Sequence, residues 1–121
     1  MLCTGVDLIE IERVQQTLAR HRQAFLKRCF TAQEQRDCNG RIESLAARFA
    51  AKEAVAKALG TGIGPVSFLE IEVRRGAKGQ PQLYLSGQAA TRAQTLGIQQ
   101  WSLSLSHSRG LAVAFVVGLS D

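Results

Sequence analysis

A long helix-forming segment, from about Ile42 to Leu59, constrains the fold of this chain more than any other feature. It is rich in alanine, contains neither glycine nor proline, and is followed by Gly60, the residue best suited to the left-handed conformation past a helix end. At about 100° per residue, four alanines fall on a side where another backbone can approach closely: Ala46, Ala47, Ala50 and Ala54. The segment therefore predicts a helix built for burial.

The chain beyond Pro65 has the pattern of β-strands. Residues 68–74 alternate, residues 75–79 are turn-forming, and residues 82–85 suit the second strand of a hairpin. Ser86 can cap a helix that runs to Leu96 and ends at Gly97; residues 101–108 then alternate strictly, 109–110 turn, and 111–117 suit a central strand. We expect an α+β fold, with helices packed on a mostly antiparallel sheet, in a single domain spanning residues 1–121.

The N-terminal segment begins as a short apolar strand at 2–9 and turns into a helix, because apolar residues then fall at helical spacing: Leu8, Ile11, Val14 and Leu18. Thr31 and Glu34 form a capping box for a second short helix, and residues 37–41 are expected to be a loop. Asp7 has two interpretations. It forms a capping pair with Glu10, or it is a ligand of a hard cation such as Mg²⁺, for which Asp7 and Glu53 with ligand phosphates would suffice.

Four charged residues interrupt the apolar faces of the long helix: Arg48, Lys52, Glu53 and Lys57. Arg48 and Lys52 lie in the middle of its bulky apolar stripe, while Glu53 and Lys57 have the order favoured for an ion pair, worth about 0.2–0.5 kcal/mol on an exposed helix. Buried charges are costly unless they are partnered or face a wet cleft. The pattern leaves a structural ion pair and a cleft with two cations and one carboxylate as alternatives.

Two further features have a structural and a functional interpretation. The glycine loop at 60–64 is either a helix cap with a turn, or a turn whose amides contact a phosphate; it follows a helix and lacks Gly-Lys-Ser/Thr, so it is not a P-loop. His107 has the parity of Trp101 and Leu105, which points it to the apolar face. It is either a satisfied core histidine or a phosphate or ribose contact at a strand end.

Charge and composition narrow the function classes. The net charge is +5, and the stretch from Arg13 to Gln33 contains five cations and no acid. This basic surface is either a solvated face or the binding site of an acidic partner; only two aromatics are interleaved with it, so nucleic acid is not expected. No apolar run reaches the roughly 18 residues of a membrane span, and no signal peptide opens the chain, so we expect a cytoplasmic protein that does not bind membranes.

Five segments occur in an order that resembles a known family: Gly5-Val-Asp-Leu-Ile-Glu-Ile-Glu-Arg13, Phe30-Thr-Ala-Gln-Glu34, Arg48-Phe-Ala-Ala-Lys-Glu-Ala54, Lys57-Ala-Leu-Gly-Thr-Gly-Ile-Gly64 and Ser104-Leu-Ser-His-Ser108. Together they resemble the holo-[acyl-carrier-protein] synthases, the small bacterial 4'-phosphopantetheinyl transferases. The resemblance implies the fold of that family and a magnesium-dependent reaction. Phosphopantetheine passes from coenzyme A to a serine of apo acyl carrier protein, releasing adenosine 3',5'-bisphosphate, in support of fatty acid biosynthesis.

The resemblance also implies roles for individual residues. The metal-binding positions of the family fall on Asp7 and Glu53, which are expected to be catalytic together with Lys57, a basic residue near the transferring phosphate. Arg48, Lys57 and His107 match positions near the phosphates of coenzyme A, and Gly60 begins a turn that lets backbone and ligand approach each other. Members are typically homotrimers with active sites between subunits, so His107 is expected to serve a neighbouring chain.

In the family the first helix docks the acidic carrier protein, which suggests four residues here: Arg13, Arg20, Phe25 and Arg28. The loop at 37–43 is shorter than in some members, so Arg41 is the only basic candidate left there, without an assigned role; Lys52 also has none. Two rival functions stay open: a non-catalytic basic module for nucleic acid or an acidic protein, and a transferase that serves carriers of secondary metabolism.

Overall fold

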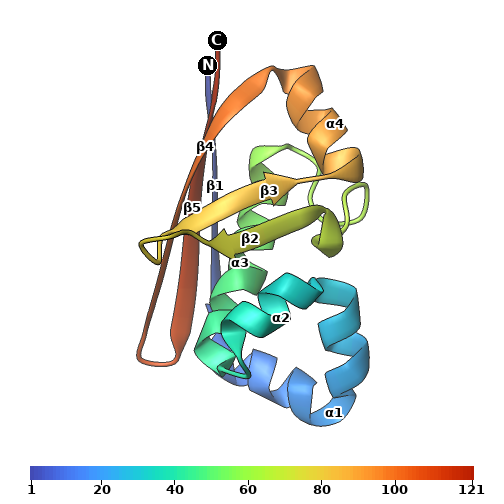
Figure 1. Ribbon diagram of the computed structural model, residues 1–121, viewed down its shortest axis with the longest axis vertical. Helices are drawn as coiled ribbons and strands as arrows, with labels where there is room; N and C mark the ends of the chain where they lie inside the picture. The colour runs from blue at the N-terminus through green and yellow to red at the C-terminus, as the bar shows by residue number, and fades with distance from the viewer.

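The computed structural model describes residues 1–121 and confirms an α+β architecture of helices packed against antiparallel sheets (Figure 1). In chain order the elements are β1 (Leu2–Glu10), α1 (Ile11–Cys29), α2 (Ala32–Cys38), α3 (Ile42–Ala58), the 3-10 helix η1 (Phe68–Glu70), β2 (Ile71–Arg75), β3 (Pro81–Leu85), α4 (Gly87–Leu96), β4 (Ile98–Ser108) and β5 (Leu111–Ser120). None of these helices is both long enough and apolar enough to cross a membrane.

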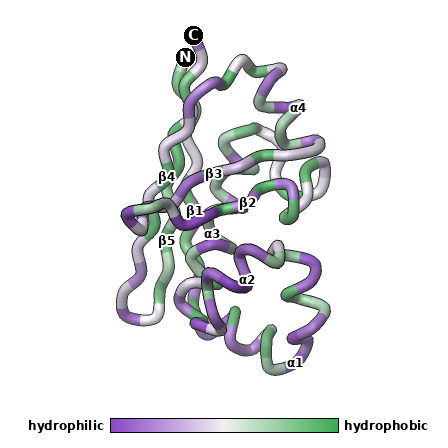
Figure 2. The backbone as a smooth tube through the Cα atoms, viewed as in Figure 1, coloured by the Kyte–Doolittle hydropathy of each residue, from purple (hydrophilic) through white to green (hydrophobic).

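A three-stranded sheet in the order β1-β5-β4 forms one side of the molecule, and both termini lie at its upper end (Figure 1). All its neighbours are antiparallel, and the apolar run at 111–117 forms the central strand, as predicted. Alternate residues of β5 face α3 and are fully buried, namely Ala112, Ala114 and Val116. Figure 2 shows this sheet largely in hydrophobic and neutral colours, whereas α2 is largely hydrophilic.

The opposite face of this sheet carries large apolar side chains that this chain leaves exposed. Val6 and Phe115 lie opposite each other in the β1–β5 register, with exposed fractions of 54% and 45%. Leu2 and Leu119 form a second such pair, and Leu8 is also exposed. Contiguous apolar surface of this kind is characteristic of an interaction face.

Helix α3 runs between this sheet and the remaining elements, and it contributes to two buried clusters. One cluster joins α3 to the sheets and α4, and the other joins it to α1, α2 and η1. The predicted small-residue side is confirmed, because Gly5 of β1 lies directly on it: a Cβ at Gly5 would meet the Ala54 carbonyl oxygen at 1.8 Å. Only glycine in the strand permits this approach, because the atoms that a Cβ would meet are backbone atoms of the helix.

The start of α1 differs from the prediction. Leu8 belongs to β1, and Asp7 lies within that strand opposite Ala114 instead of capping a helix. Helix α1 begins at Ile11; Glu10 precedes it but makes no side-chain cap hydrogen bond. Strand β1 and helix α1 are joined without a loop. Leu8, near the end of the strand, therefore also matches the helical spacing of the apolar residues that follow it. The helix is bent at His21, where φ is −140°.

Three local predictions are corrected further along the chain. The capping box of Thr31 and Glu34 is confirmed, but α2 includes the first two residues of the expected loop and ends at Cys38. Residues 68–74 do not form one strand, because 68–70 form η1. The hydroxyl of Ser86 does not cap α4; instead the Gln88 amide donates to the Glu70 carboxylate. The capping group therefore comes from a residue distant in sequence, which local pattern does not reveal.

Candidate functional site

Asp7 and Glu53 lie together in one pocket of about 390 Å³, although they are far apart in the sequence. Asp7 projects from the middle of β1 and Glu53 from the middle of α3, and the close approach of these two elements at Gly5 brings them together. Helix α1 supplies the other wall, which includes Arg13 and Phe25. The pocket therefore combines two carboxylates with one exposed cation and apolar side chains.

Partial burial and the neighbouring Asp7 carboxylate raise the pKa of Glu53 above its ordinary value. Partial burial is the larger cause and the negative charge of Asp7 is the second, while the ammonium group of Lys57 acts in the opposite direction. A cation bound between Asp7 and Glu53 would lower the pKa of Glu53 again, because a positive charge stabilises the ionised carboxylate. Carboxylate oxygens are the ligands that Mg²⁺ prefers, and it takes one or two of them beside phosphate oxygens and water. The donor set of Asp7 and Glu53 therefore fits such a cation.

Lys57 lies at the edge of the pocket, but not in the ion pair that its spacing predicts. Its Nζ donates to Asp7 Oδ1 at 2.9 Å and to the Val6 carbonyl oxygen at 3.0 Å, and it makes no ion pair with Glu53. The Glu53–Lys57 ion pair, one of the two alternatives left by the sequence, does not form, because the approach of β1 offers Lys57 the carboxylate of Asp7. About half of the Lys57 side chain stays exposed.

Arg48 and Lys52 point away from this pocket and bind the free edge of β2. Lys52 is fully buried and its Nζ donates to Glu34 Oε1 (2.7 Å) and to the Phe68 and Ile71 carbonyl oxygens (2.9 and 2.6 Å). Arg48 Nε donates to the Val73 carbonyl oxygen at 3.3 Å. Helix α3 therefore does not present a cleft with two cations and one carboxylate. Arg48 and Lys52 instead bind carbonyl oxygens at the edge of β2 that has no neighbouring strand.

Acidic residues of α2 complete the pairing of this edge. Glu34 Oε2 accepts the Val73 amide at 2.9 Å, and Asp37 Oδ2 accepts the Arg75 amide at 3.4 Å. Asp37 also lies 3.8 Å from the Arg48 guanidinium, and its carbonyl oxygen accepts from Arg41. The structure thus accounts for Lys52 and gives Arg41 and Arg48 partners within the chain. A contact of Arg48 with a coenzyme A phosphate stays a prediction.

The glycine loop follows α3 as a cap and turn. Gly60 has a φ of 78°, which confirms the predicted helix end. The amides of Thr61 and Gly62 both donate to the Ala56 carbonyl oxygen, and the Gly64 amide donates to Val66. Because these amides are engaged within the chain, the conformation favours the cap over a cradle of free amides; binding of coenzyme A beside Gly60 stays a prediction.

His107 is not a core histidine. Although its parity matches that of Trp101 and Leu105, it lies near the end of β4 opposite Ala112 and is exposed. Parity does not lead to burial at this end of the strand, since Trp101 and Leu105 are half-buried whereas His107 is exposed. His107 does not line the pocket of Asp7 and Glu53 in the same chain.

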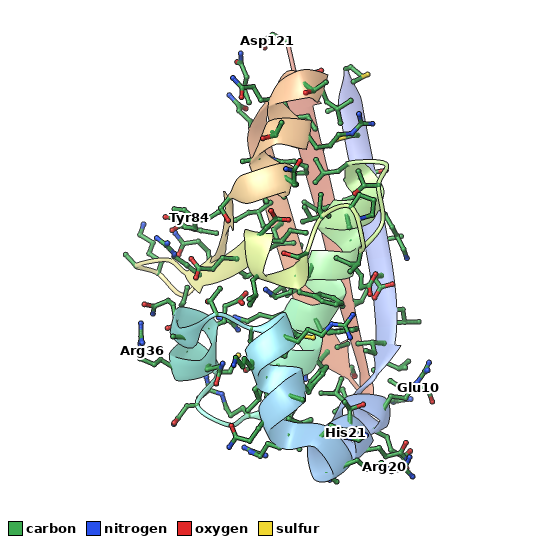
Figure 3. The ribbon with its side chains drawn as sticks, turned by 90° about the vertical axis from the view of Figure 1, so that its right-hand side faces the viewer. Glu10, Arg20, His21, Arg36, Tyr84 and Asp121 are labelled. Carbon is green, nitrogen blue, oxygen red and sulfur yellow. The ribbon has the colours of Figure 1, made fainter.

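The four residues suggested on α1 extend from the pocket along the helix. Arg13 and Phe25 line the pocket itself, and Phe25 and Arg28 line an adjoining apolar pocket of about 380 Å³. Arg20 precedes His21 at the bend of α1, and both project from the lower end of the molecule, as Figure 3 shows. The structure therefore brings Arg13 and Phe25 next to the two carboxylates, and places Arg20 and Arg28 farther along the same helix.

Phe49 is a pocket residue that the sequence did not reveal. Its ring separates the two pockets, and it contacts Phe25 (5.8 Å between centroids) and stacks on Phe68 (5.1 Å). The pattern showed Phe49 only as part of an apolar stripe, and nothing local distinguishes a core phenylalanine from one at a pocket wall.

Comparison with known proteins assigns the chain and its fold to a family. Residues 3–116 match the model of the 4'-phosphopantetheinyl transferase superfamily, and the chain belongs to this family. A holo-[acyl-carrier-protein] synthase from Herpetosiphon aurantiacus is 51% identical, covering 98% of this chain and 99% of the relative. One from Dehalococcoides mccartyi is 52% identical, with 97% and 98% covered.

Solved structures show the same similarity. A Helicobacter pylori holo-[acyl-carrier-protein] synthase in complex with coenzyme A has a TM-score of 0.88 and 36% identity, covering 96% of this chain and 99% of that one. A Bacillus anthracis holo-(acyl-carrier-protein) synthase in complex with CoA (3',5'-ADP) has a TM-score of 0.80 and 40% identity, with 98% and 96% covered.

Proposed function

We propose that this chain transfers the 4'-phosphopantetheine group of coenzyme A to a serine of apo acyl carrier protein, giving the holo carrier and adenosine 3',5'-bisphosphate. Similarity to holo-[acyl-carrier-protein] synthases over nearly the whole chain supports this reaction. The observation that carries the proposal is the convergence of Asp7 and Glu53 in one pocket, with Lys57 at its edge. The rival non-catalytic basic module does not explain why two carboxylates from distant segments share a pocket. The rival transferase of secondary metabolism would use the same pocket and differs only in the carrier that it serves.

In the proposed site Asp7 and Glu53 would hold Mg²⁺ beside the pyrophosphate of coenzyme A. When bound, the ion neutralises phosphate charge. The serine oxygen of the carrier attacks the β-phosphorus, a new P–O bond forms, and the bond to the nucleotide phosphate breaks. Glu53, or a water that it orients, accepts the serine proton. Lys57 stabilises the negative charge that develops on the leaving nucleotide.

The remaining coenzyme A contacts are proposed for Arg48, Gly60 and His107. Because His107 lies outside the pocket of its own chain, we place it in the site of a neighbouring subunit. The exposed apolar face formed by β1 and β5 supports a homotrimer, since charged residues are few there and large side chains are accessible. Leu8 belongs to that face and also to the pocket, so subunit contact and active site would adjoin.

The acidic carrier protein is proposed to dock on α1. Arg13, Arg20 and Arg28 are exposed cations, and Phe25 presents an aromatic ring between the two pockets. Charges of this kind steer an acidic partner and accelerate association. A carrier bound there would bring its serine toward the pocket of Asp7 and Glu53. A role in fatty acid biosynthesis and a cytoplasmic location stay predictions of the sequence.

The test is an incubation of the protein with coenzyme A, Mg²⁺ and a purified apo acyl carrier protein, followed by intact-mass measurement of the carrier. We expect the mass to increase by one phosphopantetheine group. Glu53→Gln should abolish the transfer while the circular dichroism spectrum remains that of the wild type. Turnover close to wild type in this variant would remove Glu53 from the mechanism, and no transfer by the wild-type protein would overturn the proposed function.

A further inference from the structure

The most deeply buried charges of this protein lie outside the pocket and are not used by the proposed reaction. Lys52 and Glu34 are both fully buried and form an ion pair of 2.7 Å. All three donors of the Lys52 ammonium group are occupied, by Glu34 and by the carbonyl oxygens of Phe68 and Ile71. Buried ion pairs of this kind are weak evidence of a stabilising role, so their presence invites a different explanation.

Glu34 adds two backbone hydrogen bonds to the same network. Its Oε1 also accepts the Thr31 amide at 2.9 Å, which closes the capping box of α2, and its Oε2 accepts the Val73 amide. One ion pair therefore joins α2, α3, η1 and β2 through directional bonds. Apolar side chains of similar volume could fill this space, but they could not fix the positions of these four elements relative to one another.

A row of aromatic rings connects this network to the pocket. Phe30 lies below the Lys52 ammonium group, 5.7 Å from Nζ to the ring centroid, and Phe68 offers its carbonyl oxygen to the same nitrogen. Phe25 packs edge-on against Phe30 at 5.6 Å and lies 5.8 Å from Phe49, which stacks on Phe68. Both ends of the row thus contact Lys52, and the two middle rings form the wall of the pocket.

The position of Phe25 makes such an anchor necessary. Helix α1 is bent at His21, so the segment that carries Phe25 is not held in line by the first half of the helix. Arg28 on this segment is exposed, and the Phe25 ring packs on the rings of Phe30 and Phe49. The placement of the second half of α1 therefore depends in part on rings that contact the Lys52–Glu34 pair, while Gln35 and the buried Cys29 also hold the end of the helix.

We propose that the Lys52–Glu34 ion pair positions the Phe25–Phe49 wall, and with it the second half of α1, for binding of the carrier protein. Lys52 and Glu34 are positioning residues, since neither lines the pocket. The inference rests on the proposed docking of the carrier on α1. It predicts that loss of the pair impairs recognition of the carrier and leaves recognition of coenzyme A nearly unchanged.

The kinetic test uses the double variant Lys52→Met/Glu34→Gln, which removes both charges at similar volume. Its control is Ile98→Ala, a core truncation at the start of β4 below α4 that contacts neither pocket. At a temperature where both variants are folded, we expect the KM for apo carrier to rise about tenfold in the double variant, a loss of about 1.4 kcal/mol. Its KM for coenzyme A, and both constants of the control, should stay within twofold of wild type.

A spectroscopic test reads the ring positions without any substrate. The chain has five phenylalanines, and 4-fluorophenylalanine labelling gives one ¹⁹F resonance for each. Phe115, on the far face of the sheet, is the internal reference. In the double variant the resonances of Phe25 and Phe49 should shift or broaden while that of Phe115 does not. If the double variant does not fold, Phe30→Leu, which keeps the ion pair but removes the ring between Lys52 and Phe25, should shift Phe25 and raise the carrier KM.

Unmoved Phe25 and Phe49 resonances, an unchanged carrier KM, or equal increases of both KM values in the folded variant would overturn the inference. Failure of the proposed function gives a different result, because the wild-type protein would then transfer nothing to any carrier while the ¹⁹F spectra still report the ring positions.

Discussion

Gly5→Ala should damage both stability and catalysis, because the contact that Gly5 makes is also the contact that assembles the pocket. A Cβ at this position would lie 1.8 Å from the Ala54 carbonyl oxygen and 2.7 Å from its carbonyl carbon. These are backbone atoms of a buried helix, so no side chain can rotate away. A carbon and a carbonyl oxygen normally lie about 3.3 Å apart or more, so β1 and α3 would have to separate locally by roughly 1.5 Å.

The magnitude follows from that displacement. Added methyl groups in a packed interior typically cost about 1–3 kcal/mol, and a clash with rigid backbone belongs at or above the upper end of this range. We expect the free energy of unfolding to fall by about 3 kcal/mol. Asp7 is two residues from Gly5, and Glu53 adjoins Ala54, so the two carboxylates would separate as well. Misplacement of catalytic groups by about 1 Å reduces turnover by roughly 100-fold.

Urea denaturation and turnover measurements on folded protein check both parts. Gly40→Ala is the matched control, since Gly40 has a φ of +76° and open space around its Cβ position in the turn between α2 and α3. That variant carries backbone strain of about 1 kcal/mol without a clash, and it should keep wild-type turnover. The reasoning is refuted if Gly5→Ala loses no more stability than Gly40→Ala, or if its turnover stays within twofold of wild type.

Three further predictions concern other parts of the proposed site. Phe115→Glu should convert the proposed trimer to monomers and abolish turnover, because it puts a charge on the exposed apolar face. An unchanged mass in sedimentation equilibrium would contradict this. Glu53→Gln should raise the melting temperature of the metal-free protein at pH 8 but not at pH 4. Burial and the charge of Asp7 raise the pKa of Glu53 in the folded protein. The wild type therefore loses stability as the pH rises through this raised pKa, and the neutral glutamine avoids that loss. Equal differences at both pH values would be inconsistent with it. Arg20→Glu should raise the KM for the carrier about tenfold at low salt and by a smaller factor at 0.5 M NaCl. Arg36→Glu, on α2, should leave the carrier KM unchanged. Equal effects of the two substitutions would argue against docking on α1.

Periodicity and capping signals predicted much of the fold. The long helix and its end at Gly60, the hairpin, the central strand and the capping box at Thr31 all depend on local sequence, and all are present. The start of α1 was misplaced because strand and helix join without a turn. The cap of α4 was misassigned because its partner, Glu70, lies 18 residues before Gln88.

The partners of the charged residues of α3 could not be predicted from local sequence pattern. A helical wheel revealed that Arg48 and Lys52 interrupt an apolar stripe, but their partners are backbone groups of β2 and carboxylates of α2, which no spacing rule connects. Likewise, the i to i+4 rule paired Lys57 with Glu53, whereas the nearby strand supplies Asp7. The meeting of Asp7 and Glu53 was expected only through the resemblance to a family, since helix and strand patterns carry no information on tertiary contacts.

Measurement of phosphopantetheine transfer with paired variants tests the central claim most directly. Wild type, Glu53→Gln and Asp7→Asn are incubated with coenzyme A, apo acyl carrier protein and either Mg²⁺ or EDTA, and the carrier is weighed. We predict a holo carrier only with wild type and Mg²⁺, while isothermal titration shows that the variants lose Mg²⁺-dependent binding of coenzyme A. Formation of holo carrier by either variant at a rate near wild type, or by wild type in EDTA, would contradict a site built from these two carboxylates.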